Sequence, residues 1–227
     1  MIPMKIDLHV HTSEVSSCGR VPAAEMVCLY CEVGYDAIVI TDHLIAGKNA
    51  EMPMDERVRW YLSGYHAAKA EGDKRGLTVL LGAELRFDCG YEDYLLYGLT
   101  GADIAPIMRD LDDGILPGDF YRRLRKENRM VLIQAHPFRP DLHQAPLDEL
   151  DGIEVYNGHP EHDSHNDLAM ARALQGGEHF IKTSGSDAHK VHHVGRGGMV
   201  VDEVIADSQA LARWLRAHPN GERIETH

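Results

Sequence analysis

The chain has no long apolar run and no excess of basic residues. None of its 227 residues lies in an apolar stretch approaching the roughly 18 that a membrane-spanning helix needs. Lys and Arg number 23 against 36 Asp and Glu, giving a formal net charge of −13. That balance argues against a basic surface for extended nucleic acid. No apolar signal core follows Met1, so we expect a soluble, cytoplasmic protein.

Cysteine is scarce as well, with four residues in the chain. Only Cys28 and Cys31 have the C-x-x-C spacing of a metal or redox pair, and no second pair is present to complete a zinc knuckle. They fall within an amphipathic segment, residues 21–34. We therefore interpret them as small side chains packed in a helix.

What the chain does have is a repeated unit: a short apolar run, then polar residues that can bind metal, then a loop or helix. The apolar runs are residues 5–10, 37–40, 78–81, 94–99, 130–133, 152–156 and 180–183. Helices are predicted at residues 21–34, 51–74, 117–129, 165–175 and 209–217. This alternation indicates an α/β fold with βαβ units and a parallel sheet. Seven runs with polar ends suggest a β/α barrel, whose chemistry collects where the strands end.

No composition shift or linker divides the sequence, and residues 110–118 form only a short predicted loop. We expect one domain over residues 1–227.

The polar residues at the run ends are His and carboxylate side chains. His9 and His11 are two apart, so on a strand both point to the same side. Glu84 ends a strand where an unpaired acid would be costly to bury, and a carboxylate can bridge two metal ions. Asp187 and His189 repeat the alternate spacing. Such mixed ligands suit zinc, iron or manganese.

His43 and His136 also follow buried-looking runs, and each taken alone is better explained as a hydrogen-bonded core histidine. The recurrence of such residues at successive strand ends carries the metal hypothesis.

The segments that contain these residues resemble the ordered motifs of the polymerase and histidinol phosphatase (PHP) superfamily. The segments are Asp7-Leu-His-Val-His11-Thr, Ile40-Thr-Asp-His43, Gly82-Ala-Glu84, Ala135-His136-Pro and Ser186-Asp187-Ala-His189. The match runs from residue 5 to about residue 200.

The resemblance implies a distorted seven-stranded β/α barrel and a cluster of two or three divalent metal ions. It places one ion on His9, His11, Glu84 and Asp187. Glu84 would bridge to a second ion on His136, and a third would lie on His43 and His189. Asp42 would orient a ligand rather than bind directly.

Two positions depart from the family pattern. Where the family often has an Asp or His after the first motif, this chain has Ser16 and Ser17, with Glu14 the nearest acid. Where the family commonly has a His entering the fourth strand, this chain has Tyr94, with Asp93 beside it. Glu14, Asp93 and Tyr94 are possible replacement ligands.

The reaction implied is hydrolysis of a phosphomonoester or small nucleotide phosphodiester by a metal-activated hydroxide, with roles for Glu84, Asp187 and Asp42. Arg139 and Arg196 are candidates to bind the substrate phosphate, and Arg86 is a weaker one.

The run His159-x-x-His162-x-x-His165 matches no family ligand position, so we expect a solvated loop with some substrate contact. The alternative functions are an amidohydrolase-type metal hydrolase and a non-catalytic domain that binds metal or a partner.

Overall fold

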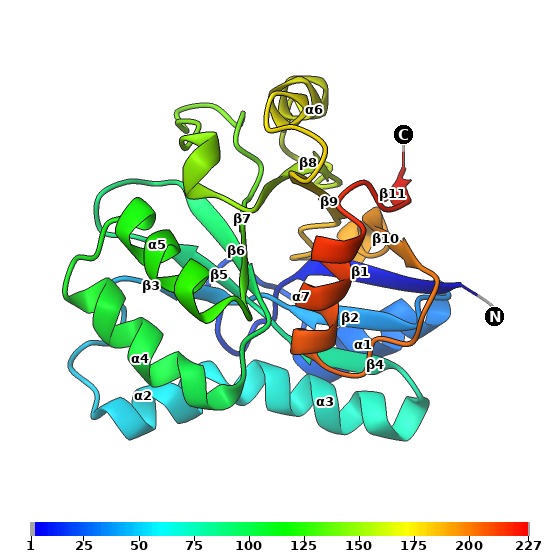
Figure 1. Ribbon diagram of the computed structural model, residues 1–227. Coiled ribbons are helices and arrows are strands. Elements are labelled where there is room, and N and C mark those ends of the chain that lie inside the picture. The colour runs from blue at the N-terminus through cyan, green and yellow to red at the C-terminus, as the bar shows by residue number, and fades with distance from the viewer. Residues whose placement is uncertain (1–2, 227) are drawn as a thin grey trace.

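The computed structural model describes residues 3–226 as a mixed α/β fold with two sheets and helices packed around them (Figure 1). The strands are β1 Met4–Val10, β2 Ala37–Ile40, β3 His43–Ile45, β4 Thr78–Leu81, β5 Ala83–Arg86, β6 Asp93–Tyr97, β7 Val131–Gln134, β8 Gly152–Asn157, β9 Ile181–Gly185, β10 Gly197–Val201 and β11 Arg223–Glu225. The helices are α1 Ala23–Glu32, α2 Met54–Tyr61, α3 Ser63–Arg75, α4 Gly101–Asp112, α5 Pro117–Glu127, α6 Asn166–Leu174 and α7 Ser208–Ala217. No helix among residues 3–226 is long and apolar enough to cross a membrane.

Each of the seven expected strands is present within a few residues of its predicted position, and the α/β class is confirmed. The sheets have the strand orders β11-β10-β1-β2-β4 and β3-β5-β6-β7-β8-β9. Parallel pairing joins β1 to β2, β2 to β4, β3 to β5, and β7 through β9. The expectation of a parallel sheet is wrong for β5-β6-β7 and for β1-β10-β11, which pair antiparallel. A short turn joins β5 to β6, and such a connection permits only antiparallel pairing.

The described strands do not form a closed barrel, because their ladders leave two open sheets. The sheets nevertheless adjoin in two ways. The chain passes from β2 to β3, and from β4 to β5, within two residues, and each time it changes sheet. The end of β1 also meets the segment after β9 through a parallel bridge between Val10 and Ala188.

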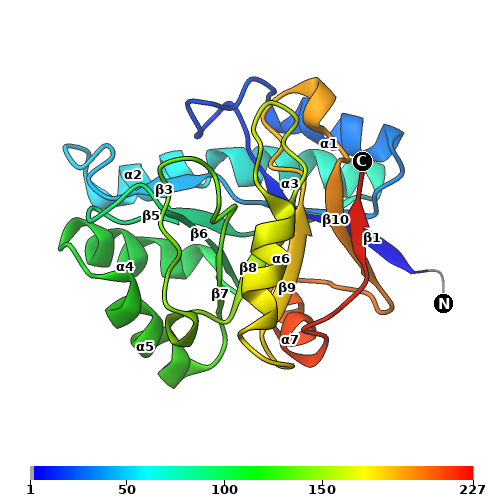
Figure 2. The same ribbon diagram turned by 90° about the horizontal axis from the view of Figure 1, so that it is seen from above.

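Strand alternation divides the core into layers. In β2, Ala37 and Val39 face a core shared by both sheets and α7, whereas Ile38 and Ile40 pack toward α1 and α3. Figure 2 shows α1 and α3 on one side of the strands and α4 and α5 on another. The helices therefore cover the outer faces and leave the strand ends open for a site.

Two helix predictions need correction. The helix expected over residues 51–74 is two helices, α2 and α3, that meet at Leu62. Helix α4 was not expected, and it occupies the first part of the loop predicted at residues 110–118. Its buried side chains, Ile104, Ile107, Met108 and Leu111, have helical spacing, and a capping box begins at Thr100. Pro106 inside the helix masks that signal.

Cys28 and Cys31 lie in α1 as expected, and both are free.

Candidate metal centre

The seven expected ligand residues come together at one end of the strands. His9 lies in β1 and His11 follows it; His43 begins β3 and Glu84 lies in β5. His136 comes two residues after β7, and Asp187 and His189 follow β9. All are buried except His43, whose side chain is 13% exposed. Both sheets therefore contribute side chains to a single cluster.

Glu84 lies at the centre of this cluster. Its Oε1 is 3.3 Å from His9 Nε2 and 3.1 Å from His136 Nε2. Its Oε2 is 3.2 Å from His11 Nε2 and 2.9 Å from His43 Nδ1. The two oxygens of one carboxylate thus face two pairs of imidazoles, which is the arrangement that a bridging ligand requires.

Asp187 closes the cluster on the opposite side. Its Oδ1 is 3.4 Å from His9 Nε2, 3.3 Å from His11 Nε2 and 3.3 Å from His189 Nδ1. Its Oδ2 accepts a hydrogen bond of 2.5 Å from Arg139 Nη2. One oxygen therefore faces the imidazoles, and the other is held by a cation.

Hydrogen bonds on the outer side fix the histidine rings. His9 Nδ1 is 2.9 Å from Glu154 Oε1, and His11 Nδ1 is 3.1 Å from Ser16 Oγ. The Ser16 hydroxyl donates in turn to Asp42 Oδ1 at 2.7 Å. Such contacts engage Nδ1 and leave the Nε2 atoms of both histidines facing inward, where they would bind metal on losing their protons.

Asp42 therefore lies behind His11 rather than among the inward-facing atoms. Its Oδ1 also accepts from the backbone N–H of Thr12 at 2.7 Å, and its Oδ2 accepts from the Thr12 hydroxyl at 2.6 Å.

Four inward-facing atoms lack hydrogen-bond partners among the described residues. These buried atoms are His9 Nε2, His11 Nε2, His43 Nδ1 and Glu84 Oε2. Unpartnered buried polar atoms are rare because each is costly. Sets of three of these side chains lie close enough together to hold one ion. The sets include His9 with His11 and Glu84, His9 with His136 and Asp187, and His11 with His43 and His189. The donor set and its unpartnered atoms therefore fit divalent metal ions.

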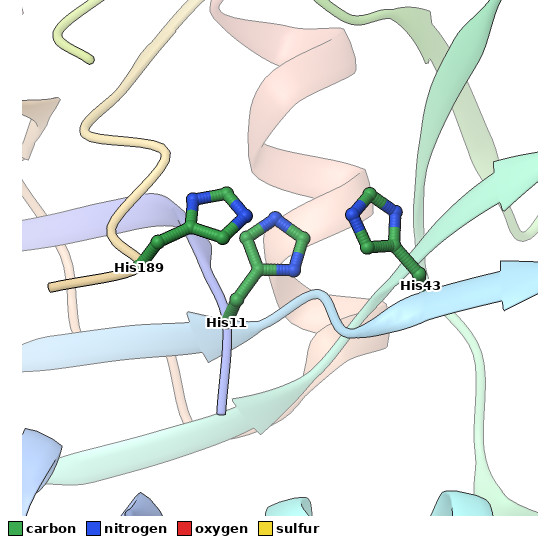
Figure 3. Close-up of side chains that lie close together, drawn as sticks. All are labelled: His11, His43 and His189. Carbon is green, nitrogen blue, oxygen red and sulfur yellow. The ribbon is translucent and has the colours of Figure 1, made fainter. Parts of the chain in front are cut away.

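Figure 3 shows the last of these groups, with the rings of His11, His43 and His189 gathered from three different segments. The ring centroid of His11 lies 4.6 Å from that of His43 and 4.2 Å from that of His189.

The charged side chains of the cluster shift one another's pKa values. Burial raises the pKa of the Glu84 carboxyl, but the imidazoles of His43 and His9 outweigh it and hold the pKa well below its usual value. Burial likewise opposes ionisation of Asp187, but His9 and Arg139 hold its pKa well below the usual value. Burial, together with the nearby His11, lowers the pKa of His189 to about 3. Both carboxylates are therefore ionised and ready to bind cations.

The backbone is strained at two of the seven residues. His136 has φ of 27° and Asp187 has φ of 52°, positive values that are uncommon for residues other than glycine, although Asn, Asp and His adopt them more often than the rest. Such strain persists only where the surroundings impose it, and it gathers at functional sites.

Of the arginine candidates, Arg139 contacts the cluster directly, through Asp187. Its Nη2 also donates to Asn157 Oδ1 at 2.8 Å, and its Nε donates to Ser164 Oγ at 3.2 Å. Arg86 lines the cavity that His43, Glu84 and Asp187 also line. It forms a two-point ion pair with Asp93, at 2.8 and 2.7 Å. Arg196 does not line this cavity, and its Nε donates to the carbonyl of Gly158 at 3.0 Å.

The cavity has a volume of about 390 Å³, and one of the three possible replacement ligands lines it. Asp93 lines it, whereas Tyr94 is buried in the core and packs edge-to-face on Phe87. Glu14 lies elsewhere, because its carboxylate accepts hydrogen bonds from the backbone N–H of Ala23 at the start of α1.

The expectation of a solvated loop after β8 is wrong for His159, which is 8% exposed and lines the cavity. Burial lowers its pKa to about 4, and nearby Arg139 adds to this while Asp187 opposes it. His162 is exposed and lines the cavity too, whereas His165 lies outside it at the start of α6.

Sequence reasoning missed Glu154, Asn157 and Cys18. Glu154 lies within β8, where it reads as one polar residue of a strand, and it approaches His9 across 145 positions of sequence. Cys18 lines the cavity from the loop after β1.

Comparison with known protein families shows which family the sequence matches. The PHP domain model matches residues 7–190, and a PHP-associated model matches residues 164–218. No curated protein matches the chain significantly.

Among solved structures, a two-domain protein from Bacteroides vulgatus contains a PHP-like metal-dependent phosphoesterase, an activity that is itself a prediction. It is 18% identical with a TM-score of 0.62 over 94% of this chain, which spans only 62% of that protein's length.

Two further structures share the fold. A Bifidobacterium adolescentis protein, whose metal-dependent phosphoesterase activity is also a prediction, is 16% identical with a TM-score of 0.54; the match covers 92% of this chain and 95% of that one. An amidohydrolase from Chromobacterium violaceum, with bound sulfate and no metal, is 18% identical with a TM-score of 0.52, covering 81% and 87% of the two chains. At these identities the structures show the fold alone, but the PHP model spans most of the sequence, and the chain belongs to the PHP domain family.

Proposed function

We propose that this protein hydrolyses phosphate esters of small molecules at a centre of two or three zinc, manganese or iron ions. The observation that carries the proposal is the convergence of seven His, Asp and Glu side chains, four of which (His9, His11, His43 and Glu84) have a buried inward atom without a hydrogen-bond partner among the described residues. When bound, such ions lower the pKa of a water ligand to about 7 and draw charge from phosphoryl oxygens. Mixed nitrogen and oxygen donors suit these metals better than magnesium or calcium.

The protein's own side chains then have separate tasks. Glu84 faces four imidazoles, so its two oxygens would bind neighbouring ions. Asp187 would complete the position formed by His9 and His136, while Arg139 holds its outer oxygen. Asp42 keeps His11 in place through Ser16. These side chains orient the donors before any substrate enters.

Arg139 is also the best-placed group for the substrate phosphate. Hydrogen bonds to Asn157 and Ser164 fix its guanidinium at the cavity wall, beside the ligand carboxylate of Asp187. These contacts use Nε and Nη2, so Nη1 would donate to a phosphate, and fixing the guanidinium in advance reduces the entropy lost on binding. Arg196 remains a weaker candidate, because it would have to leave the Gly158 carbonyl to reach the cavity.

The size and charge of the protein favour small substrates. A cavity of about 390 Å³ is within the range of small-ligand sites. The net charge of −13 disfavours an extended nucleic acid.

The test is Glu84→Gln, which keeps the size of the side chain and removes its charge. We expect loss of bound metal by elemental analysis and a fall of about 10²–10³-fold in hydrolysis of p-nitrophenyl phosphate with added manganese. Glu203→Gln, at an exposed position away from the cavity, is the matched control. Full activity in Glu84→Gln would refute the scheme.

The same preparations separate the alternatives. A wild-type protein that binds metal without cleaving p-nitrophenyl phosphate or a dinucleotide would favour a non-catalytic domain. Cleavage of an amide in place of either ester would favour the amidohydrolase function.

A further inference from the structure

The loop between β1 and α1 presents a different residue to the metal centre from those expected there. Ser16 is held away from the cavity: its hydroxyl donates to Asp42, and it accepts from the backbone N–H of His43 at 3.1 Å. Ser17 is exposed. Neither serine lines the cavity, whereas Cys18 does, with its side chain partly buried.

Backbone contacts fix this loop on both sides of Cys18. The N–H of Gly19 donates to the carbonyl of Ser16 at 2.9 Å, and the N–H of Arg20 donates to the carbonyl of His189 at 2.8 Å. A Cβ atom at position 19 would lie 2.6 Å from the carbonyl oxygen of Thr12. Only glycine permits this approach, so the loop packs tightly and holds Cys18 at the rim of the cavity.

Cys18 lines the same cavity as His43 and His189. Its thiol lies within hydrogen-bonding reach of the His43 side chain, and His11 is close enough to act on it electrostatically. Figure 3 shows the rings of these three histidines together. The ligand atoms of His11, His43 and His189 lie within 4.8 Å of one another. His11 is fully buried, and its Nε2 has no hydrogen-bond partner among the described residues. Three imidazoles leave a tetrahedral ion one ligand short.

We propose that Cys18 supplies a thiolate ligand to the metal position that His43 and His189 form with His11. The inference rests on the metal centre of the proposed function and names a ligand for its least complete position. A thiolate carries the same single negative charge as the aspartate often found in the family. It is a softer donor, so this position selects zinc or iron over manganese.

Cobalt(II) gives a direct readout that does not depend on turnover. Cobalt bound by a thiolate has a near-ultraviolet charge-transfer band that imidazole and carboxylate ligands do not produce. We expect the full chain to show this band when loaded with cobalt and Cys18→Ser to lose it. Cys18→Asp keeps the charge and should retain the metal without the band. The matched control is Cys89→Ser, because Cys89 is free and exposed outside the metal cavity.

Thiol alkylation tests the wild-type protein without a substitution. Iodoacetamide labelling followed by peptide mass spectrometry should modify Cys18 after a chelator has removed the metal. In the zinc-loaded protein, labelling of Cys18 should slow by about tenfold or more, because a bound thiolate is both shielded and less nucleophilic. Cys89 should react equally in both samples.

The inference is overturned if Cys18→Ser keeps the band, if zinc does not protect Cys18, or if the wild-type protein binds cobalt without the band. Its failure is distinguishable from failure of the proposed function. A protein with the thiolate band that hydrolyses no ester refutes the function alone. A protein that hydrolyses esters without the band refutes the Cys18 ligand alone.

Discussion

Glu154 is a buried carboxylate that contacts two of the seven candidate metal ligands, His9 and His136, without being one of them. Its Oε1 is 2.9 Å from His9 Nδ1. Its Oε2 accepts from the backbone N–H of His136 at 3.1 Å and from Asn157 Nδ2 at 2.9 Å. One side chain therefore orients one ligand directly and fixes the strained backbone of another.

Glu154→Gln should disturb this arrangement while keeping its shape. Glutamine has one acceptor oxygen in place of two, so its NH₂ group must face either His9 Nδ1–H or the two donors that Oε2 now accepts. In the first case His9 changes tautomer and its Nε2 becomes a donor. In the second, the His136 N–H and the Asn157 NH₂ lose their acceptor. Both outcomes weaken metal binding.

The expected magnitude follows from the role of such supporting contacts. Replacing an outer hydrogen-bond partner of a metal ligand costs about 10- to 100-fold in affinity. That range corresponds to about 1.4–2.7 kcal/mol of binding free energy. A buried donor left without an acceptor should also lower the unfolding free energy of the metal-free protein by about 1–3 kcal/mol.

The assay is competition for zinc against a chromogenic chelator, paired with urea unfolding in excess chelator. Glu203→Gln serves as the surface control. Wild-type zinc affinity in Glu154→Gln would refute the reasoning, since the variant cannot satisfy all three donors. Lower stability with unchanged affinity would limit Glu154 to a structural role.

Two further predictions concern packing and pH. In an ordinary helix a Gly→Ala change stabilises the protein. Gly64→Ala should instead lower the unfolding free energy by about 1–3 kcal/mol in urea titrations, because the new Cβ would overlap the Thr12 hydroxyl and lie 2.7 Å from Asp42 Oδ2. Gly101→Ala is the control, because the nearest atom to its new Cβ is 3.4 Å away. Burial lowers the pKa of His9 and of His43, but Asp187 and Glu154 outweigh burial at His9 and Glu84 outweighs it at His43. Both pKa values therefore lie well above the usual value, and the metal-free site holds protons at neutral pH. Zinc affinity should therefore rise with pH, and calorimetry at pH 7 in buffers of different ionisation enthalpy should detect proton release, whose absence would contradict this protonation state.

The sequence was most informative where strands are apolar throughout. The run over β2 is buried on both faces, and its pattern predicts a strand without any tertiary information. Strands β3 and β5 were not predicted, because each has three or four residues and includes a polar ligand, His43 or Glu84. Their pairing with each other, rather than their composition, makes them strands.

The site could be predicted as a set of residues but not as a geometry. The recurrence of His and carboxylate residues at the ends of apolar runs predicts the residues that surround Glu84 in the structure. Glu154 and Cys18 could not be predicted, because their importance depends on neighbours that the fold supplies. Glu14 illustrates the converse, since an acid near a motif in sequence is engaged at a helix start in space.

The wide separation of the ligands along the chain, from His9 to His189, bears on when metal can bind. A zinc finger gathers its ligands within a short segment, and the ion drives its folding. Here the candidate ligands come from five separate segments, so an ion in the unfolded chain would have to close several loops at once, each at an entropic cost of about 3 kcal/mol. We therefore expect the chain to fold first and any ions to bind afterwards, with the fold stabilised meanwhile by attraction between protonated imidazoles and carboxylates. Metal supply would then determine when the protein becomes active, and not whether it folds.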